Sequence, residues 1–68
     1  MLPTVGRIVN YNVGTKEDPK LLAAVVCWVW NDTLVNLMVI NVNGLTEGKT
    51  SVVQGENGNE WSWPIIKK

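Results

Sequence analysis

The chain has 68 residues, with six basic and six acidic side chains, so its formal net charge at pH 7 is zero. A chain of this length forms one domain at most and buries only about 60% of its unfolded surface. One cysteine and no histidine exclude an internal disulfide and leave a zinc site without its usual ligands. We therefore expect a single domain over residues 1–68, with no cofactor, stabilised by tight packing or by association with another chain.

The charge and hydropathy patterns argue against several classes of partner. Proteins that bind nucleic acids normally present a clustered basic patch, and the few Lys and Arg residues here are scattered. The opening MLPTVGR lacks the charged and apolar regions of a signal peptide. The longest apolar run, Leu21–Trp30, is too short for a membrane-spanning helix, which needs about 20 residues. We expect a protein that folds inside a cell, with no membrane partner.

The first part of the chain predicts a strand followed by a polar loop. TVGRIVNY, over Thr4–Tyr11, has the composition of a strand, in which Gly6 indicates a bulge or a sharp bend. Most side chains of the next segment, Asn12–Lys20, are polar, and Gly14 and Pro19 interrupt it. It is either a recognition loop or a solvated connector.

The most apolar stretch predicts a central β-hairpin. Leu21–Trp30 and Thr33–Val42 are rich in β-branched and aromatic residues, and neither shows a polar stripe of helical period. Between them, Asn31-Asp32 fits a two-residue turn. Such a turn pairs Trp28 with Val35, Val26 with Leu37 and Cys27 with Asn36.

This register makes both faces of the hairpin apolar. An antiparallel sheet with one solvated face alternates between apolar and polar residues, and this hairpin does not. One face should therefore fill the core, and the other should be covered by the rest of this chain or by another chain. Cys27, within the apolar run, is expected to be a small buried hydrophobe rather than a nucleophile.

Two further strands are predicted after the hairpin. Asn43–Gly48 contains an Asn-Gly turn signal and leads to a fourth strand, Lys49–Gln54. Gly55–Asn59 connects it to a fifth strand, Glu60–Pro64, which Pro64 ends because it has no N–H to donate. Residues 65–68 extend this edge or fray. Five short strands without a helix predict an all-β fold, a small five-stranded SH3-like barrel.

Four blocks of the sequence resemble a family of small proteins encoded by tailed bacteriophages. The blocks are GRIVNY at 6–11, VWNDTLVNLMV at 29–39, TSV at 50–52 and WSWP at 61–64. Members of the family carry a GRIV-x-Y opening, a VW-x-DT…VNL-x-V centre, a TSV step and a W-x-WP finish, in this order. The resemblance implies a phage protein located in the host cytoplasm or the virion. The family is of uncharacterised function, so it implies no catalytic or binding residue.

The residue types do not favour catalysis. No histidine is present, and the candidate nucleophiles Ser51, Ser62 and Cys27 have no base beside them in the sequence. Glycines occur singly, without a phosphate-binding loop. We expect no enzymatic activity and no metal.

Tryptophan is the unusual feature, with four residues among 68. They form two pairs with i, i+2 spacing, Trp28/Trp30 and Trp61/Trp63, so both members of a pair share one face of a strand. Either the four line the barrel, or one pair is exposed; one exposed pair presents roughly 300–500 Å², at about 150–250 Å² per aromatic ring.

These features predict a protein–protein interaction or assembly module that possesses no catalytic activity and contacts itself, a virion protein or a host protein. The expected contact residues are Trp28, Trp30, Trp61 and Trp63, with Tyr11 behind them. The alternative is a small barrel that binds single-stranded nucleic acid weakly, since bases stack on aromatic pairs.

Overall fold

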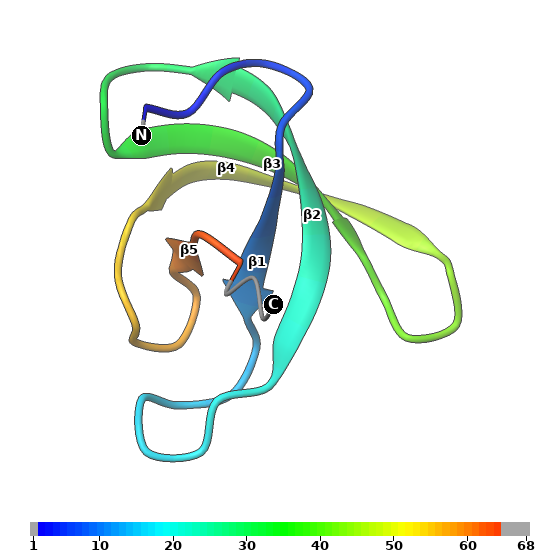
Figure 1. Cartoon of the computed structure of the whole chain (residues 1–68). Coiled ribbons are helices and arrows are strands. Elements are labelled where there is room, and N and C mark those ends of the chain that lie inside the picture. Colours follow the sequence, from blue (N-terminus) through cyan, green and yellow to red (C-terminus); the bar gives the residue numbers. More distant parts are fainter. Residues whose placement is uncertain (1, 65–68) are drawn as a thin grey trace, which may run out of the picture.

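One curled antiparallel sheet makes up the fold in the computed structural model, which describes residues 2–64. The strands are β1 Ile8–Asn12, β2 Leu21–Val29, β3 Leu34–Ile40, β4 Thr46–Val53 and β5 Trp61–Ser62. They are hydrogen-bonded in the order β4-β3-β2-β1-β5 and curl into a half-barrel, from which the β3–β4 hairpin projects (Figure 1). This confirms the predicted all-β, SH3-like fold. The prediction for residues 65–68 lies outside the described residues.

The bend predicted at Gly6 is present and shortens the first strand. A turn brings the Arg7 amide to the Thr4 carbonyl at 3.1 Å, and Gly6 has a φ of +93°. The Gly6 amide donates to the Val26 carbonyl, and the Val26 amide donates to the Arg7 carbonyl. Gly6 and Arg7 therefore both lie opposite Val26, as in a β-bulge. Strand β1 begins at Ile8 rather than at Thr4.

The turn between β3 and β4 lies earlier in the chain than predicted, because β3 ends at Ile40 rather than Val42 and β4 begins at Thr46. The Asn41 amide donates to the Leu45 carbonyl at 2.8 Å, and Gly44 has a φ of +85°. Gly44 is thus the glycine that the turn needs. Gly48, which the sequence placed in the loop, lies within the strand opposite Met38.

These two glycines predict opposite effects of alanine. A Cβ at Gly48 would meet no heavy atom within 4 Å and the backbone there is not left-handed; Gly48→Ala should stabilise the monomer by about 0.5–1 kcal/mol. At Gly44 the positive φ should make alanine cost about 1–2 kcal/mol. Urea unfolding of both variants in dilute solution checks this, and equal effects at the two positions would contradict it.

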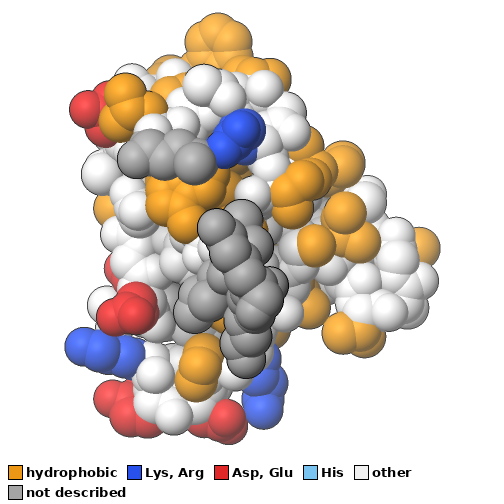
Figure 2. Space-filling view, in the orientation of Figure 1, with side chains coloured by type: hydrophobic (Ala, Val, Ile, Leu, Met, Phe, Trp, Pro, Cys, Tyr) orange, Lys and Arg blue, Asp and Glu red, His pale blue; other side chains and the backbone are white. Residues whose placement is uncertain are grey.

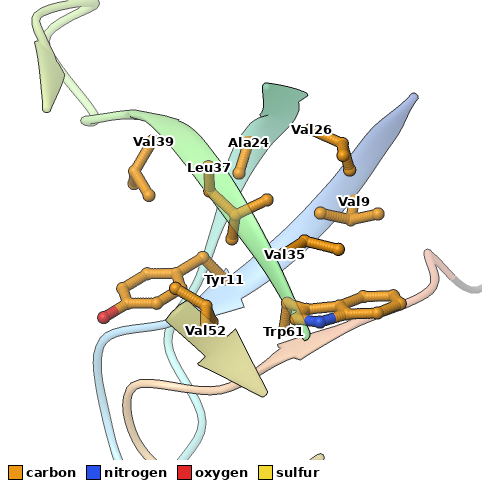
Figure 3. Close-up of a cluster of buried hydrophobic side chains, with 9 residues drawn as sticks. All are labelled: Val9, Tyr11, Ala24, Val26, Val35, Leu37, Val39, Val52 and Trp61. Atoms are coloured by element: carbon orange, nitrogen blue, oxygen red, sulfur yellow. The ribbon is translucent and has the colours of Figure 1, made fainter. Parts of the chain in front are cut away.

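The core lies on the concave side of the sheet. Its buried side chains come from β1 to β5 and form one cluster, with the indole of Trp61 at one end of it (Figure 3). They are Val9, Tyr11, Ala24, Val26, Val35, Leu37, Val39, Val52 and Trp61. Trp61 has no exposed surface, and its indole N–H donates to the Thr33 carbonyl at 2.9 Å. One aromatic side chain therefore closes the barrel and ties it to the loop before β3.

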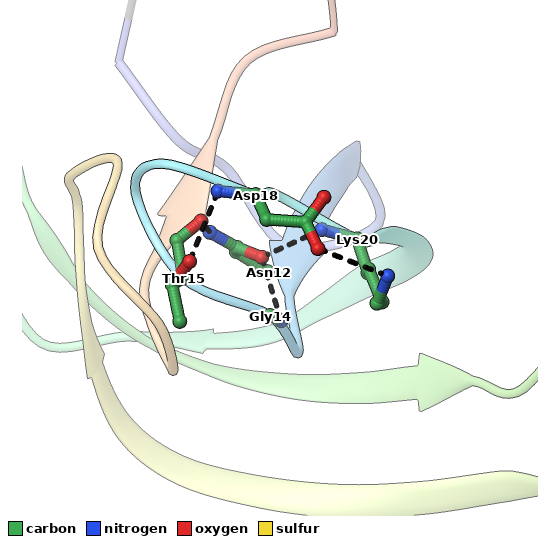
Figure 4. Close-up of polar contacts among 5 residues, drawn as sticks. All are labelled: Asn12, Gly14, Thr15, Asp18 and Lys20. Carbon is green, nitrogen blue, oxygen red and sulfur yellow. Dashed lines mark hydrogen bonds and ion pairs between the residues drawn. The ribbon is translucent and has the colours of Figure 1, made fainter.

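A buried asparagine fixes the loop after β1. Asn12 is 2% exposed, and its Oδ1 accepts from the Gly14 amide at 2.8 Å and the Lys20 amide at 3.0 Å (Figure 4). Its Nδ2 donates to the carbonyls of Thr15 and Glu56, at 3.0 and 3.2 Å. The amide is fully paired, as buried polar groups normally are. The loop is solvated at its charged tip and anchored at its base.

The two charged side chains of β4 lie on the concave side. Glu47 and Lys49 pair in register with the core residues Val39 and Leu37, and they form an ion pair with each other. Their hydrogen bond, followed by the carboxylate charge, raises the pKa of Lys49 above its usual value. Neither charge reaches the convex face of the sheet.

Candidate interaction surface

A β-bulge interrupts the central hairpin. The strands pair as predicted up to Val26 opposite Leu37, but the next pair is Trp28 with Asn36. Cys27 is thus the extra residue of a bulge, and the predicted pairs of Cys27 with Asn36 and of Trp28 with Val35 are wrong. The alternation of side chains between the two faces of a strand does not reveal where the strand contains one extra residue.

The bulge exchanges the two faces of β2 beyond Val26. Val29 lies opposite Val35 and packs against the core, whereas Trp28 turns to the convex side and is 53% exposed. Strict alternation would have buried Trp28 beside Val26. Cys27 is also exposed, so the prediction of a buried thiol is wrong, because residues 2–64 leave this side of β2 uncovered.

The connection after β2 is longer than the predicted two-residue turn. The Trp30 amide donates to the Leu34 carbonyl at 2.9 Å, so residues 30–33 form the loop. Oδ1 of Asn31 accepts from the amides of Thr33 and Leu34, both at 2.9 Å. The asparagine shapes the turn, as its residue type predicts, but Trp30 does not pair with Thr33.

Asn36 joins this bulge to a second one in β4. The pairing of β3 with β4 slips between Val35 and Leu37, and Ser51 there has a φ of +54°, a conformation that L residues adopt at a cost. Oδ1 of Asn36 accepts from the Ser51 amide at 2.8 Å and from the Trp30 indole N–H at 2.9 Å. A single amide oxygen therefore holds both the strained backbone and the exposed indole.

The resulting surface is apolar and uncharged. We call it the outer face; it consists of Ile8, Val25, Cys27, Trp28, Trp30, Asn36 and Met38. Ile8, Val25 and Met38 form a row across three strands. Beside this row, the rings of Trp28 and Trp30 meet edge to face with centroids 6.4 Å apart. None of these residues is charged, and the described residues leave the face uncovered.

The structure separates the residues predicted for the contact surface. Trp28 and Trp30 are 53% and 57% exposed, whereas Trp61 and Tyr11 are buried in the core. Trp63 is half-buried, 5.3 Å from the ring of Trp61 and 5.7 Å from the guanidinium of Arg7. Trp61 has no exposed surface and cannot contact a partner, so this part of the prediction is wrong. Trp28 and Trp30 form the exposed pair, Trp63 is only partly exposed, and Tyr11 lies in the core behind the surface.

Sequence reasoning missed the other residues of the outer face. These residues were placed in strands but were not assigned to a contact surface; they are Ile8, Val25, Cys27, Asn36 and Met38. The signal that could have found them is the doubly apolar hairpin, which predicted a second face in need of a cover. It gave no position for the bulge, and hence no orientation for Trp28.

Other kinds of site find little support in residues 2–64. They contain no cluster of three or more His, Cys, Asp or Glu side chains placed to hold a metal ion. No helix among them is long and apolar enough to cross a membrane. An open cavity of about 400 Å³ lies between the loop after β1 and β5; the Asn12 amide at its wall is already paired with backbone groups.

The fold and the outer face define the class of protein: a small, all-β, SH3-like half-barrel. In comparisons with known proteins, no family model, curated protein or solved structure matches the chain. The phage family that the four sequence blocks resemble therefore stays a prediction.

Asn36 offers a test of how the outer face is built. Asn36→Ala removes the acceptor of two hydrogen bonds, each worth about 0.5–1.5 kcal/mol, and should destabilise the monomer by about 1–3 kcal/mol. Asn36→Asp retains the acceptor and should cost far less. Urea unfolding measures both, and the indole N–H resonance of Trp30 reports the lost bond. Equal costs for the two variants would contradict this role of Asn36.

Proposed function

We propose that this chain is a protein–protein interaction or assembly module with no catalytic activity, and that the outer face is its contact surface. The observation that carries the proposal is an uncharged sheet face with two half-exposed tryptophans held in place by Asn36. Tryptophan is enriched among the residues that dominate binding energy at protein interfaces. A defined ring position lowers the ordering cost of binding.

The exposed area supports this role. The two indoles, each a little more than half exposed, present roughly 200 Å² at about 150–250 Å² per ring. Ile8 and Met38, at 53% and 36% exposure, enlarge the patch. The total falls in the range of about 300–600 Å² of the largest patch on a typical monomer, which is often functional.

The setting of this module is proposed from the resemblance in the sequence. The four blocks favour a protein of a tailed bacteriophage, acting in the host cytoplasm or in the virion. In the structure the blocks contribute to β1, the bulged β2–β3 hairpin, the bulge of β4, and β5. The blocks therefore contain Ile8, Trp30, Asn36 and Met38 of the outer face, whereas Trp28 and the bulge residue Cys27 lie outside them.

The alternative is weak binding of single-stranded nucleic acid. The exposed aromatic pair favours it, because bases stack on such rings. The outer face supplies no Lys or Arg for the phosphates, and the guanidinium of Arg7 lies against Trp63 instead. A gel shift with an oligothymidine at low salt tests this alternative, and its absence there would remove it.

Cys27 provides a native reporter for the proposed surface. It is the single cysteine of the chain and lies exposed on the outer face. A partner on this face should slow alkylation of the thiol by a maleimide at least about tenfold, as expected for a well-populated complex. The labelling is carried out under three conditions. The protein is dilute in buffer, dilute in the macromolecular fraction of the expressing cells, or at high concentration in buffer without other proteins. The small-molecule filtrate of the same extract controls for competing thiols.

A matched variant shows whether protection is specific. Cys27→Ser combined with Asn43→Cys moves the thiol to the tip of the β3–β4 hairpin, where it should react equally fast under all three conditions. Slowing of Cys27 alone supports the proposal. Full reactivity of Cys27 under all three conditions would overturn it.

A further inference from the structure

We propose that the partner of the outer face is a second copy of this chain, packed against the same face about a two-fold axis. This inference rests on the function proposed above and names the partner for that surface. It is carried by the charge distribution, by the area of the face and by the shapes on either side of β3.

The first argument is electrostatic. A two-fold interface sets a patch against itself, so any charge near the axis meets its own like charge, and such contacts cost several kcal/mol. The outer face has no charged side chain. In the view of Figure 2, most charged groups gather around the loop after β1, while hydrophobic side chains lie over β2 and the base of the projecting hairpin. Net charge is also zero, so two copies do not repel each other as a whole.

The second argument is area. The apolar side chains of the face expose roughly 400–500 Å² per copy, the scale of a large functional patch. Two copies would bury about 800–1,000 Å² from these side chains alone, and the flanking polar groups would add to it. The total reaches the roughly 1,000 Å² that a specific interface requires.

The third argument is shape. Trp28 projects from β2 on one side of β3, and Gly48 on β4 leaves the other side without a side chain. A two-fold axis along β3 sets the β2 side of each copy against the β4 side of the other. The indole of each copy then meets the side of its partner where Gly48 leaves room, and the contact is made twice.

Asn36→Asp is the sharpest test. The carboxylate keeps both hydrogen bonds that Asn36 accepts, but it puts one charge on the face of each copy. Asn43→Asp is the matched control, because Asn43 makes a similar bond to the Leu45 amide at the distant hairpin tip. Both variants gain the same charge, and only the first should weaken a dimer.

Sedimentation velocity from about 1 µM to about 1 mM measures the association, a range that brackets dissociation constants of weak and strong dimers. The wild-type chain should pass from its 7.6 kDa monomer to a particle of twice that mass. Asn36→Asp should raise the dissociation constant at least about 30-fold, the effect of a strong interface residue, and Asn43→Asp should leave it within about threefold. Gly48→Leu, which the monomer accommodates, should weaken the dimer as well.

Each outcome decides between the proposals. A wild-type dimer that dissociates in Asn36→Asp but not in Asn43→Asp supports the inference, as does concentration-dependent protection of Cys27. A dimer indifferent to both Asn36→Asp and Gly48→Leu uses another surface and overturns it. A monomer over the whole range also overturns it, yet protection of Cys27 by the cell extract would then keep the proposed function, with a different protein as partner.

Discussion

Trp61→Ala is expected to leave the chain largely unfolded at 25 °C. The side chain is the largest in the core and has no exposed surface. Replacing a buried tryptophan with alanine costs about 3–5 kcal/mol, and a core of this size rarely supplies more than about 3–5 kcal/mol in total. One substitution therefore removes most of the stability. Far-UV circular dichroism and urea unfolding should show the loss of the cooperative transition.

Two other tryptophan variants make this test specific. Trp61→Phe keeps most of the buried area but loses the N–H bond to Thr33, whose carbonyl still accepts from the Gln54 amide at 2.9 Å. It should remain folded, at a cost of about 1–3 kcal/mol. Trp28→Ala, at a half-exposed ring, should change the stability of the monomer by less than about 1 kcal/mol. If Trp61→Ala unfolded no more readily than Trp28→Ala, the assignment of the two rings to core and surface would be wrong.

Asn12→Ala is expected to destabilise the fold by about 3 kcal/mol and to release two loops at once. It removes four hydrogen bonds, each worth about 0.5–1.5 kcal/mol net. The amides of Gly14 and Lys20 lose their shared acceptor, and the carbonyl of Glu56 loses the contact that ties the second loop to the first. Urea unfolding gives the cost, and amide hydrogen exchange at Gly14 and Lys20 should accelerate well beyond the global change.

The control for Asn12 lies in the β3–β4 turn. Oδ1 of Asn43 also accepts a hydrogen bond from the backbone amide two residues ahead, that of Leu45 at 3.1 Å. Asn43 is exposed, however, and makes only this one bond of the kind. Water can replace that bond, so Asn43→Ala should cost less than about 1 kcal/mol. A similar cost at both positions would show that burial of the Asn12 amide is not what anchors the loops.

The outer face shows that the tryptophans of this protein have two separate roles. Two tryptophan pairs with the same spacing serve different purposes: Trp61 closes the core, and Trp28 stands on the surface. The difference comes from one extra residue, Cys27, in β2. Without it, Trp28 would compete with Trp61 for space in the same small interior. The bulge thus places Trp28 on the convex side, outside the core.

The strand content and the part of the central pairing up to Val26 can be predicted from the amino-acid sequence. β-branched and aromatic runs with turn residues between them predict five strands, and Gly6 predicts a bend in the first of them. The assumed two-residue turn at Asn31-Asp32 predicts Val26 opposite Leu37, a pair that is present although the loop is longer. These features are local, or repeat with the period of a strand, so they can be recognised in a linear chain. The same pattern predicted that one face of the hairpin would need a cover.

Which residues form that face depends on contacts between strands. The bulge at Cys27, the left-handed Ser51 and the shared acceptor Asn36 depend on how β2, β3 and β4 pair with one another. Curling a sheet needs residues out of register, and their positions are set by contacts between distant strands rather than by neighbours in the chain. The sequence therefore determined that two apolar faces exist, and the packing of the barrel decided which tryptophans lie inside it.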